Sequence, residues 1–297
     1  MKQLFAALLV SVFLTSCGGG GSAGSTPTPP KAVLVGEIFS TPSQLNTADL
    51  AFTAGYAGNL TTSRAIKAAG KTNLLDLLLM FPAPTAQGRV LDRLLPDAEQ
   101  RLVQYVAANG DLLTPGVRVL VLDEIFWNPP DQSDSDAVLQ PQLDAFKAAV
   151  ALVRKHIPGA AIGITVTPYA TFGRPNTLRF IQMALRDLDW VGTDPYWLGD
   201  AAVIPALHNW SATFHTLAKS VKPTLETWFI AQAFRLSSYD LPTFNAYIAQ
   251  HLLDAERYDN VLFFGWQFAS ELDPSSAGIN FPVETKRLYR KYLKSTP

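Results

Sequence analysis

Two glutamates, Glu124 and Glu226, each lie at the end of a short apolar run that continues into aromatic residues. The runs are VRVLVLDEIFW at residues 117–127 and PTLETWF at residues 223–229. Two carboxyl groups held about 5–5.5 Å apart can cleave a glycosidic bond with retention, because one protonates the leaving oxygen while the other attacks the anomeric carbon. Their proximity raises the pKa of one group and keeps it protonated near neutral pH. We therefore predict that these two glutamates form a catalytic pair.

Other carboxylates and aromatic residues follow the remaining apolar runs. Carboxylates can hydrogen-bond sugar hydroxyls, and aromatic faces stack on the C–H faces of sugar rings. We expect a carbohydrate site lined by Asp123, Glu37, Tyr169, Asp194, Tyr196, Trp197, Trp228 and Trp266. A structural role is the alternative for six residues: a salt bridge in a turn for Glu226 and similarly for Glu124, a turn for Asp194, an unspecified structural role for Glu37, and packing against loops for Trp197 and Tyr169.

These residues need strands and helices that bring them together. Runs rich in Val, Ile and Phe are typical of strands buried on both faces, and they occupy residues 33–39, 74–81, 117–127, 161–168, 190–197, 223–229 and 261–269, with a weaker candidate at 51–56. The run at 74–81 also fits a buried helical turn. Apolar residues at helical spacing predict helices at 141–157, 178–188, 206–221, 241–258 and 283–293.

The alternation of strands and helices predicts a parallel sheet covered by helices. Five strand–helix units begin at residue 117, and the chain before it has room for three more. No GxGxxG loop follows the first strand, which argues against an open dinucleotide-binding sheet. We predict an α/β fold, a single (β/α)8 (TIM) barrel over residues 31–297, with its site at the C-terminal ends of the strands. Strands four and seven face each other across the barrel mouth, so Glu124 and Glu226 would converge there.

The N-terminal residues predict export and a lipid anchor. Lys2 precedes an apolar stretch, LFAALLVSVFL, that is too short to span a bilayer. The following LTSC resembles a bacterial lipobox, so we predict a signal peptide at residues 1–16, acylation of Cys17 and a Gly/Ser/Pro-rich tether at 17–30. The alternative is an ordinary cleaved signal with an incidental cysteine. Gly18 follows the cysteine, and the resemblance to lipoproteins of Gram-negative bacteria then implies the outer membrane of the cell envelope, on its periplasmic or surface side.

The composition is that of a globular protein, with 48% apolar and 16% charged residues among 297. The chain has 24 basic and 25 acidic residues, so it lacks the basic excess of a general nucleic-acid binder. Its single cysteine cannot form an internal disulfide. No HExxH pair occurs, and the acidic run DQSDSD lacks the glycine and terminal glutamate of a calcium loop, so we predict neither metal nor cofactor. We expect a monomer whose partners are a carbohydrate and, through its anchor, a membrane.

The motifs VLDEIFW, WVGTDPYW, PTLETWF and FFGWQF resemble those of glycoside hydrolase clan A, in this order, from strand four onward. PTLETWF is most similar to the nucleophile strand of endo-β-1,4-galactanases and endo-mannanases. The resemblance implies that Glu124 is the acid/base and Glu226 the nucleophile. It also implies that Trp266 lies under the sugar and that Tyr196 lies near the nucleophile. Asp123 departs from the pattern, because the clan usually has an asparagine before the acid/base glutamate.

Three hypotheses follow for the function. The first is a retaining β-glycoside hydrolase that acts on a polysaccharide or oligosaccharide. The second is a carbohydrate-binding barrel without turnover, for which Asp123 could be one mark. The third is an inverting or substrate-assisted glycosidase like the chitinase-type barrels; it ranks lower because VRVLVLDE lacks their DxxDxDxE spacing.

Overall fold

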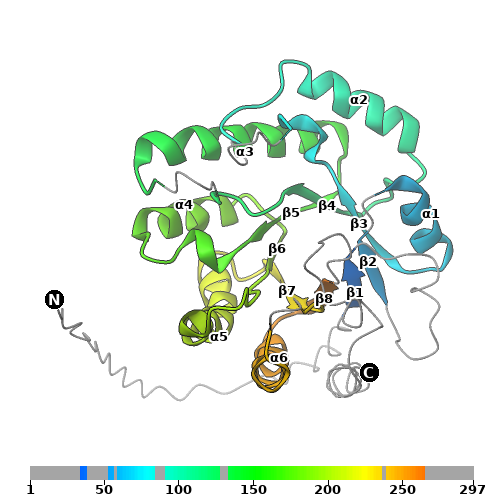
Figure 1. Cartoon of the computed structure of the whole chain (residues 1–297). Helices are drawn as coiled ribbons and strands as arrows, with labels where there is room; N and C mark the ends of the chain where they lie inside the picture. Colours follow the sequence, from blue (N-terminus) through cyan, green and yellow to red (C-terminus); the bar gives the residue numbers. More distant parts are fainter. Residues whose placement is uncertain are drawn as a thin grey trace, which may run out of the picture. The chain divides into compact units, whose positions relative to one another are not determined.

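The computed structural model describes residues 34–38, 53–56, 59–83, 91–127, 133–235 and 239–264, all of which belong to one unit of the chain, Val33–Pro297. Eight parallel strands close a barrel in the order of the sequence, as Figure 1 shows. They are β1 Val35–Ile38, β2 Ala54–Tyr56, β3 Thr72–Asp76, β4 Arg118–Leu122, β5 Ala161–Val166, β6 Trp190–Thr193, β7 Glu226–Gln232 and β8 Asn260–Phe264. The predicted (β/α)8 barrel is confirmed.

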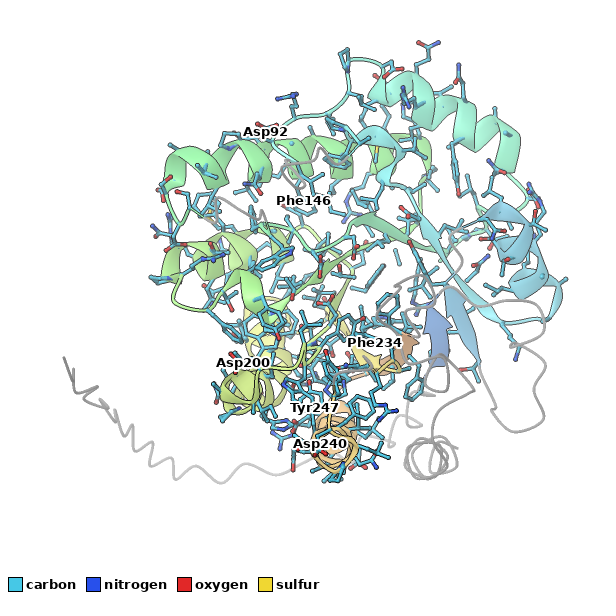
Figure 2. The ribbon with its side chains drawn as sticks, in the orientation of Figure 1. Asp92, Phe146, Asp200, Phe234, Asp240 and Tyr247 are labelled. Atoms are coloured by element: carbon cyan, nitrogen blue, oxygen red, sulfur yellow. The ribbon has the colours of Figure 1, made fainter. Side chains whose placement is uncertain are left out.

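Helices follow the strands and cover the outside of the barrel. They are α1 Leu60–Ala68, α2 Ala98–Asn109, α3 Asp136–His156, α4 Pro175–Leu185, α5 Ile204–Val221 and α6 Leu241–Ala255, with short 3₁₀ helices η2 Leu78–Met80, η3 Pro168–Ala170 and η4 Ala201–Val203. The predicted apolar stripe of α3 is buried, and Figure 2 shows its Phe146 below the helix. In the described part of the chain, no helix has the length and apolar character that crossing a membrane requires. The predicted helix at 283–293 lies outside the described residues, as does Cys17.

Most strands lie where the sequence predicts them, including the weak second strand at Ala54–Tyr56. The ambiguous run at 74–81 is divided between the end of β3 and η2. The one displaced strand is β7, which begins at Glu226 instead of ending near it. Pro223 forms a turn that is closed by a 2.9 Å bond from the Leu225 N–H to the Lys222 carbonyl. Pairing with β6 therefore begins only at Glu226, which lies opposite Trp190.

The apolar side chains form two layers. Between strands and helices lies the large outer core, to which α3 and α6 contribute most of their buried residues. A smaller cluster fills the barrel itself and contains Ala54, Tyr56, Leu74, Leu120, Trp190, Trp228 and Leu262. The side-chain period of two then places the next inward residue of each strand one step closer to the barrel mouth. This apolar cluster therefore lies directly beneath the polar residues at the barrel mouth.

Gly163 leaves space for Trp190, one of the two tryptophans in this cluster. It pairs with Trp190, whose indole lies across it and donates from Nε1 to the Ala161 carbonyl at 3.0 Å. A Cβ atom on Gly163 would lie 2.0 Å from the indole carbons Cδ2 and Cε2. At this position the barrel therefore accepts only glycine while Trp190 keeps its place.

We expect Gly163→Ala to lower the free energy of unfolding by about 3 kcal/mol or more, because overpacking of a rigid core forces the indole out of its site. Urea unfolding followed by tryptophan fluorescence measures the loss. Gly192→Ala is the matched control, since its Cβ would lie 3.1 Å from Ile230 Cδ1, the end of a flexible side chain. Equal stabilities of the two variants would contradict the assignment.

Candidate active site

Three carboxyl groups meet at the C-terminal ends of β4 and β6. Asp123 and Glu124 follow β4 directly, and Asp194 follows β6. Between these strands, Thr165 of β5 donates from Oγ1 to Asp123 Oδ1 at 2.6 Å and accepts the Glu124 N–H at 2.7 Å. One hydroxyl therefore fixes both residues of the β4 end. The predicted residues Asp123, Glu124 and Asp194 are thus brought together.

Asp194 is the buried member of this carboxyl cluster (Asp123, Glu124 and Asp194). Its residue surface is 6% exposed, whereas Glu124 is partly exposed. Its side-chain oxygen Oδ1 is buried and has no hydrogen-bond partner among the described residues. Burial, followed by the charges of Glu124 and Asp123, raises the pKa of Asp194 well above its ordinary value. Raised carboxyl pKa values of this origin are common where an enzyme needs an acid.

The backbone that carries Glu124 is strained. Glu124 has φ 50° and Phe126 has φ 64°, in the left-handed region that non-glycine residues rarely adopt. Such residues cost about 1–3 kcal/mol each and persist only where their surroundings hold them. Here the holding contacts are the Thr165 hydroxyl and the buried side chains of Ile125 and Phe126. The strain is stored at the candidate acid, which is where strain in enzymes is often found.

Aromatic residues lie beside the cluster. Tyr196 is partly buried, and its ring stacks on that of Phe264 at a centroid distance of 5.4 Å. Burial, and then the charges of Asp194, Asp123 and Glu124, raise the pKa of Tyr196 well above its ordinary value. Tyr169 donates its hydroxyl to the Tyr196 carbonyl at 2.8 Å, and its ring lies 6.1 Å from that of Trp127. Tyr169 therefore joins the ring of Trp127, which comes three residues after Glu124, to the loop that carries Asp194 and Tyr196.

Glu226 lies at the opposite end of the barrel, so its predicted pairing with Glu124 is wrong. It is the first residue of β7, and Arg118, the first residue of β4, donates to both its carboxylate oxygens at 2.9 Å. Trp228 Nε1 and Asn260 Nδ2 each donate to Glu226 Oε1 at 2.7 Å. In a parallel barrel the first residues of strands lie at the stability face, away from the chemistry. Glu226 is therefore an ion-pair partner at the barrel's N-terminal end.

Two of the predicted tryptophans are parts of the core. Trp228 is fully buried inside the barrel, with its ring 6.3 Å from that of Trp190. Trp197 is 3% exposed, stacks on Tyr239 at 4.8 Å and donates from Nε1 to the Asp200 carbonyl. Neither is placed to stack on a sugar, so both substrate-binding predictions are wrong. Their aromatic character reflects a packing need that sequence alone does not separate from binding.

Glu37 and Trp266 are the remaining predicted substrate-binding residues. Glu37 is the third residue of β1 and pairs with Gly55 and Phe263, so it lies within the strand and not after it. Trp266 lies outside the described residues. Across the described ranges, no group of three or more His, Cys, Asp or Glu side chains is arranged to hold a metal ion.

The C-terminal end of β7 carries Gln232, which sequence reasoning missed. Gln232 is fully buried; its Oε1 accepts the Trp197 N–H at 2.8 Å, and its Nε2 donates to the carbonyls of Trp197 and Phe234. Its backbone N–H donates to His251 Nε2 at 3.0 Å. The amide thus ties the loop after β6 to the loop after β7. Every second residue of a strand points to the same side, so the row of Glu226, Trp228, Ile230 and Gln232 was the sequence signal that places Gln232 inside the barrel.

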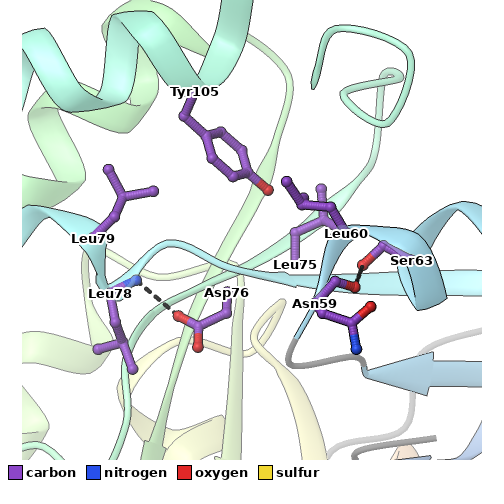
Figure 3. A pocket seen from close by; sticks show the side chains of 8 residues that line it. All are labelled: Asn59, Leu60, Ser63, Leu75, Asp76, Leu78, Leu79 and Tyr105. Atoms are coloured by element: carbon purple, nitrogen blue, oxygen red, sulfur yellow. Dashed lines mark hydrogen bonds between the residues drawn. The ribbon is translucent and has the colours of Figure 1, made fainter. Parts of the chain in front are cut away.

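Asp76 at the end of β3 was also missed, because LLDLLLM reads as one apolar run. Tyr56 donates its hydroxyl to Asp76 Oδ2, and the Leu78 N–H donates to Asp76 Oδ1, both at 2.8 Å. Asp76 lines a cavity of about 270 Å³ together with Tyr105 and the other residues drawn in Figure 3. Burial and the Asp76 charge raise the pKa of Tyr105 to about 12.

The comparisons with known proteins support the fold. No family model matches the chain, and no curated protein sequence matches it. The chain is similar to xylanase 10B from Thermotoga petrophila RKU-1 in complex with xylobiose, at 12% identity and a TM-score of 0.56, covering 89% of this chain and 94% of that one. An endoxylanase from a sugarcane soil metagenome has 8% identity and a TM-score of 0.56, with 90% and 96% covered.

A third similar structure is β-glucuronidase 2 of Bacteroides uniformis, with 11% identity, a TM-score of 0.57, and 89% of this chain but 35% of that chain covered. These solved structures are (β/α)8 barrels of glycoside hydrolase clan A. The predicted resemblance is confirmed at the level of the fold. Identities of 8–12% carry no residue of the site across.

We expect Glu226→Gln to lower the free energy of unfolding by about 3 kcal/mol, because it leaves the Arg118 guanidinium, only 17% exposed, without its counter-charge. Urea unfolding at neutral pH measures the effect. The double variant Arg118→Met with Glu226→Gln should recover part of the loss, since it removes both members of the pair. A single variant as stable as the natural protein would contradict a structural ion pair.

Proposed function

We propose that this chain hydrolyses glycosidic bonds with the carboxyl cluster at the mouth of the barrel. The observation that carries the proposal is Glu124 itself. It stands at the end of β4 on a strained backbone, fixed by Thr165, and its charge raises the pKa of the buried Asp194 carboxyl. A barrel of glycoside hydrolase type supports the same function, since barrels place their chemistry at this end.

Each member of the site has a role that its position allows. Glu124 is the partly exposed carboxyl beside the buried Asp194, so it would protonate the leaving oxygen. Asp123 accepts from Thr165 at Oδ1, and a carboxylate has further lone pairs with which it would accept from a sugar hydroxyl. The negative charges would stabilise the oxocarbenium-like transition state. Tyr196 and the partly buried Trp127 would offer ring surface to the sugar.

Retention through Glu124 and Glu226 is no part of this proposal, because the two glutamates lie at opposite ends of the barrel. Asp194 is not assigned the role of the nucleophile, because it is only 6% exposed and a nucleophile must reach the anomeric carbon.

A carbohydrate-binding barrel without turnover is the second candidate. It is favoured by Gln232, an amide at the end of β7, where the resemblance to clan A implies a nucleophilic glutamate. An amide does not attack an anomeric carbon, and this one is held in hydrogen bonds on both its oxygen and its nitrogen. In that case the carboxyl cluster would only accept hydrogen bonds from a glycan.

We expect Glu124→Gln to lower glycoside hydrolysis by about 10²–10⁴-fold, the usual contribution of a general acid. Purified full-length protein is incubated with a panel of polysaccharides and oligosaccharides, and released reducing ends are measured. Glu226→Gln is the control, and per folded molecule it should hydrolyse at the natural rate. Glycan binding without product in the natural protein would favour the second candidate, and a fully active Glu124→Gln would refute the role of the glutamate.

We also propose that acylated Cys17 anchors the chain to a bacterial membrane, with residues 17–30 as its tether. Several acyl chains on one residue suffice for stable anchoring. In a bacterium that processes lipoproteins, the natural chain should sediment with the membranes and carry acyl mass on its N-terminal peptide. Cys17→Ser should appear in the soluble fraction. A Cys17→Ser chain that stays with the membranes would contradict this anchor.

A further inference from the structure

The end of β4 departs from the regular alternation of a strand. Val119 and Val121 belong to the outer core and Leu120 to the apolar cluster inside the barrel, as alternation requires. Leu122 should then point inward, but it also lies in the outer core. The pairing with β5 shifts at the same place, between Leu120 and Leu122. One extra residue in a strand is a β-bulge, and bulges beside active sites redirect the side chains that follow them.

The bulge decides which residue of β4 faces the barrel mouth. Without it, the inward row of β4 would run through Leu122 to Glu124, whereas with it the next inward residue is Asp123. The hydrogen bond from Thr165 to Asp123 agrees with this exchange, because Thr165 follows Gly163 on the inward row of β5. Asp123 and Thr165 therefore lie on the same side of neighbouring strands.

Glu124 reaches the mouth in a different way. Its φ of 50° takes it out of the extended backbone on which alternation depends. Two bonds to one residue of β5 hold this turn. The Glu124 N–H donates to the Thr165 hydroxyl at 2.7 Å, and the Ile125 N–H donates to the Thr165 carbonyl at 3.3 Å. The side chain and the backbone of Thr165 thus act on the same turn.

The Thr165 hydroxyl makes its two bonds in opposite roles. A hydroxyl group has one proton and two lone pairs. The proton is donated to Asp123 Oδ1 at 2.6 Å, within the range of bonds to an ionised oxygen, and a lone pair accepts the Glu124 N–H. In such a chain of hydrogen bonds each bond polarises the other. One group is therefore shared between the carboxylate of Asp123 and the backbone of Glu124.

We propose that Thr165 is the positioning residue of the carboxyl cluster: its hydroxyl orients Asp123 at the barrel mouth and holds the left-handed turn that presents Glu124. The inference rests on the proposed glycoside hydrolysis and deepens it, because it explains how two consecutive residues of one strand serve one site. Thr165 acts only through these two residues and takes no part in bond making or breaking.

Thr227 offers a matched control at the other end of the barrel. Its hydroxyl also donates to a carboxylate, Asp259 Oδ2 at 3.1 Å, and also accepts a backbone N–H, that of Asp259 at 3.3 Å. It is fully buried and is the second residue of β7, far along the barrel from the carboxyl cluster. A valine at either position removes the same kinds of bond, so only effects specific to Thr165 report on the site.

Hydrogen exchange tests the tie without any substrate. The exchange of the Glu124 backbone N–H with deuterium is followed by NMR in the full chain. Thr165→Val should accelerate it about tenfold, because the amide loses its acceptor. Thr165→Ser keeps a hydroxyl and should restore slow exchange, and Thr227→Val should leave it unchanged. Natural exchange in Thr165→Val would overturn the proposal.

A second variant keeps this test decisive if Thr165→Val does not fold. Thr165→Ala removes the same hydroxyl without placing a methyl group against the Asp123 carboxylate. It should accelerate the exchange of the Glu124 N–H in the same direction, and natural exchange in this variant would also overturn the proposal.

Kinetics separate positioning from stability. On a glycan that the natural protein hydrolyses, Thr165→Val should lower kcat per folded molecule about 10²-fold, the usual result of slightly misplaced catalytic groups. KM should change less, because misplacement acts on the transition state. Thr165→Ser should recover most of the rate, and Thr227→Val should retain all of it per folded molecule.

The outcomes distinguish this inference from the proposed hydrolysis. A natural kcat in Thr165→Val, despite faster exchange, would limit Thr165 to a structural role and overturn the proposal. If the natural protein hydrolyses no glycan but the exchange responds as expected, Thr165 still positions the two carboxyl groups and the proposed hydrolysis fails.

Discussion

The hydroxyl group of Thr165 is the contact on which the candidate site depends. It donates to the Asp123 carboxylate and accepts the backbone N–H of Glu124, so a single side chain of β5 fixes the exit of β4. Without this tie, the left-handed backbone at Glu124 would relax to a more common conformation, and the carboxyl group would leave Asp194. The register between β4 and β5, which shifts at Leu120 and Leu122, brings Thr165 into place.

The two ends of the barrel differ in how the charges of their carboxyl groups are compensated. At the N-terminal end, Glu226 is matched by Arg118 and by two neutral donors, so its charge is fully compensated. At the C-terminal end, Asp123, Glu124 and Asp194 lie together, and burial and the two neighbouring charges raise the pKa of Asp194 well above its ordinary value. The first arrangement suits permanent stability, because nothing needs to change its charge. The second suits acid chemistry, because a carboxyl group with a raised pKa can hold and release a proton near neutral pH.

The sequence allowed prediction of the barrel, of most strand positions and of the cluster on β4 and β6, because apolar runs and the period of two are local properties. The prediction failed at β7, because the turn at Pro223 makes this strand begin three residues later than expected. Glu226 therefore lies at the start of the strand, and Gln232 lies at its end, at the barrel mouth. The apolar pattern of the sequence does not reveal such a shift along the strand. Trp197 and Trp228 failed for another reason, since burial is set by neighbours that lie far away in the sequence.

The Gln232 amide bears on which of the two functions the barrel performs. Its bonds to Trp197 and Phe234 hold the loops after β6 and β7 together, and the β6 loop carries Asp194 and Tyr196. A glutamate there would lose both donor bonds and would weaken the loop that carries Asp194 and Tyr196. The amide therefore positions this loop, but it cannot attack an anomeric carbon, which is why it favours the binding barrel as the second candidate.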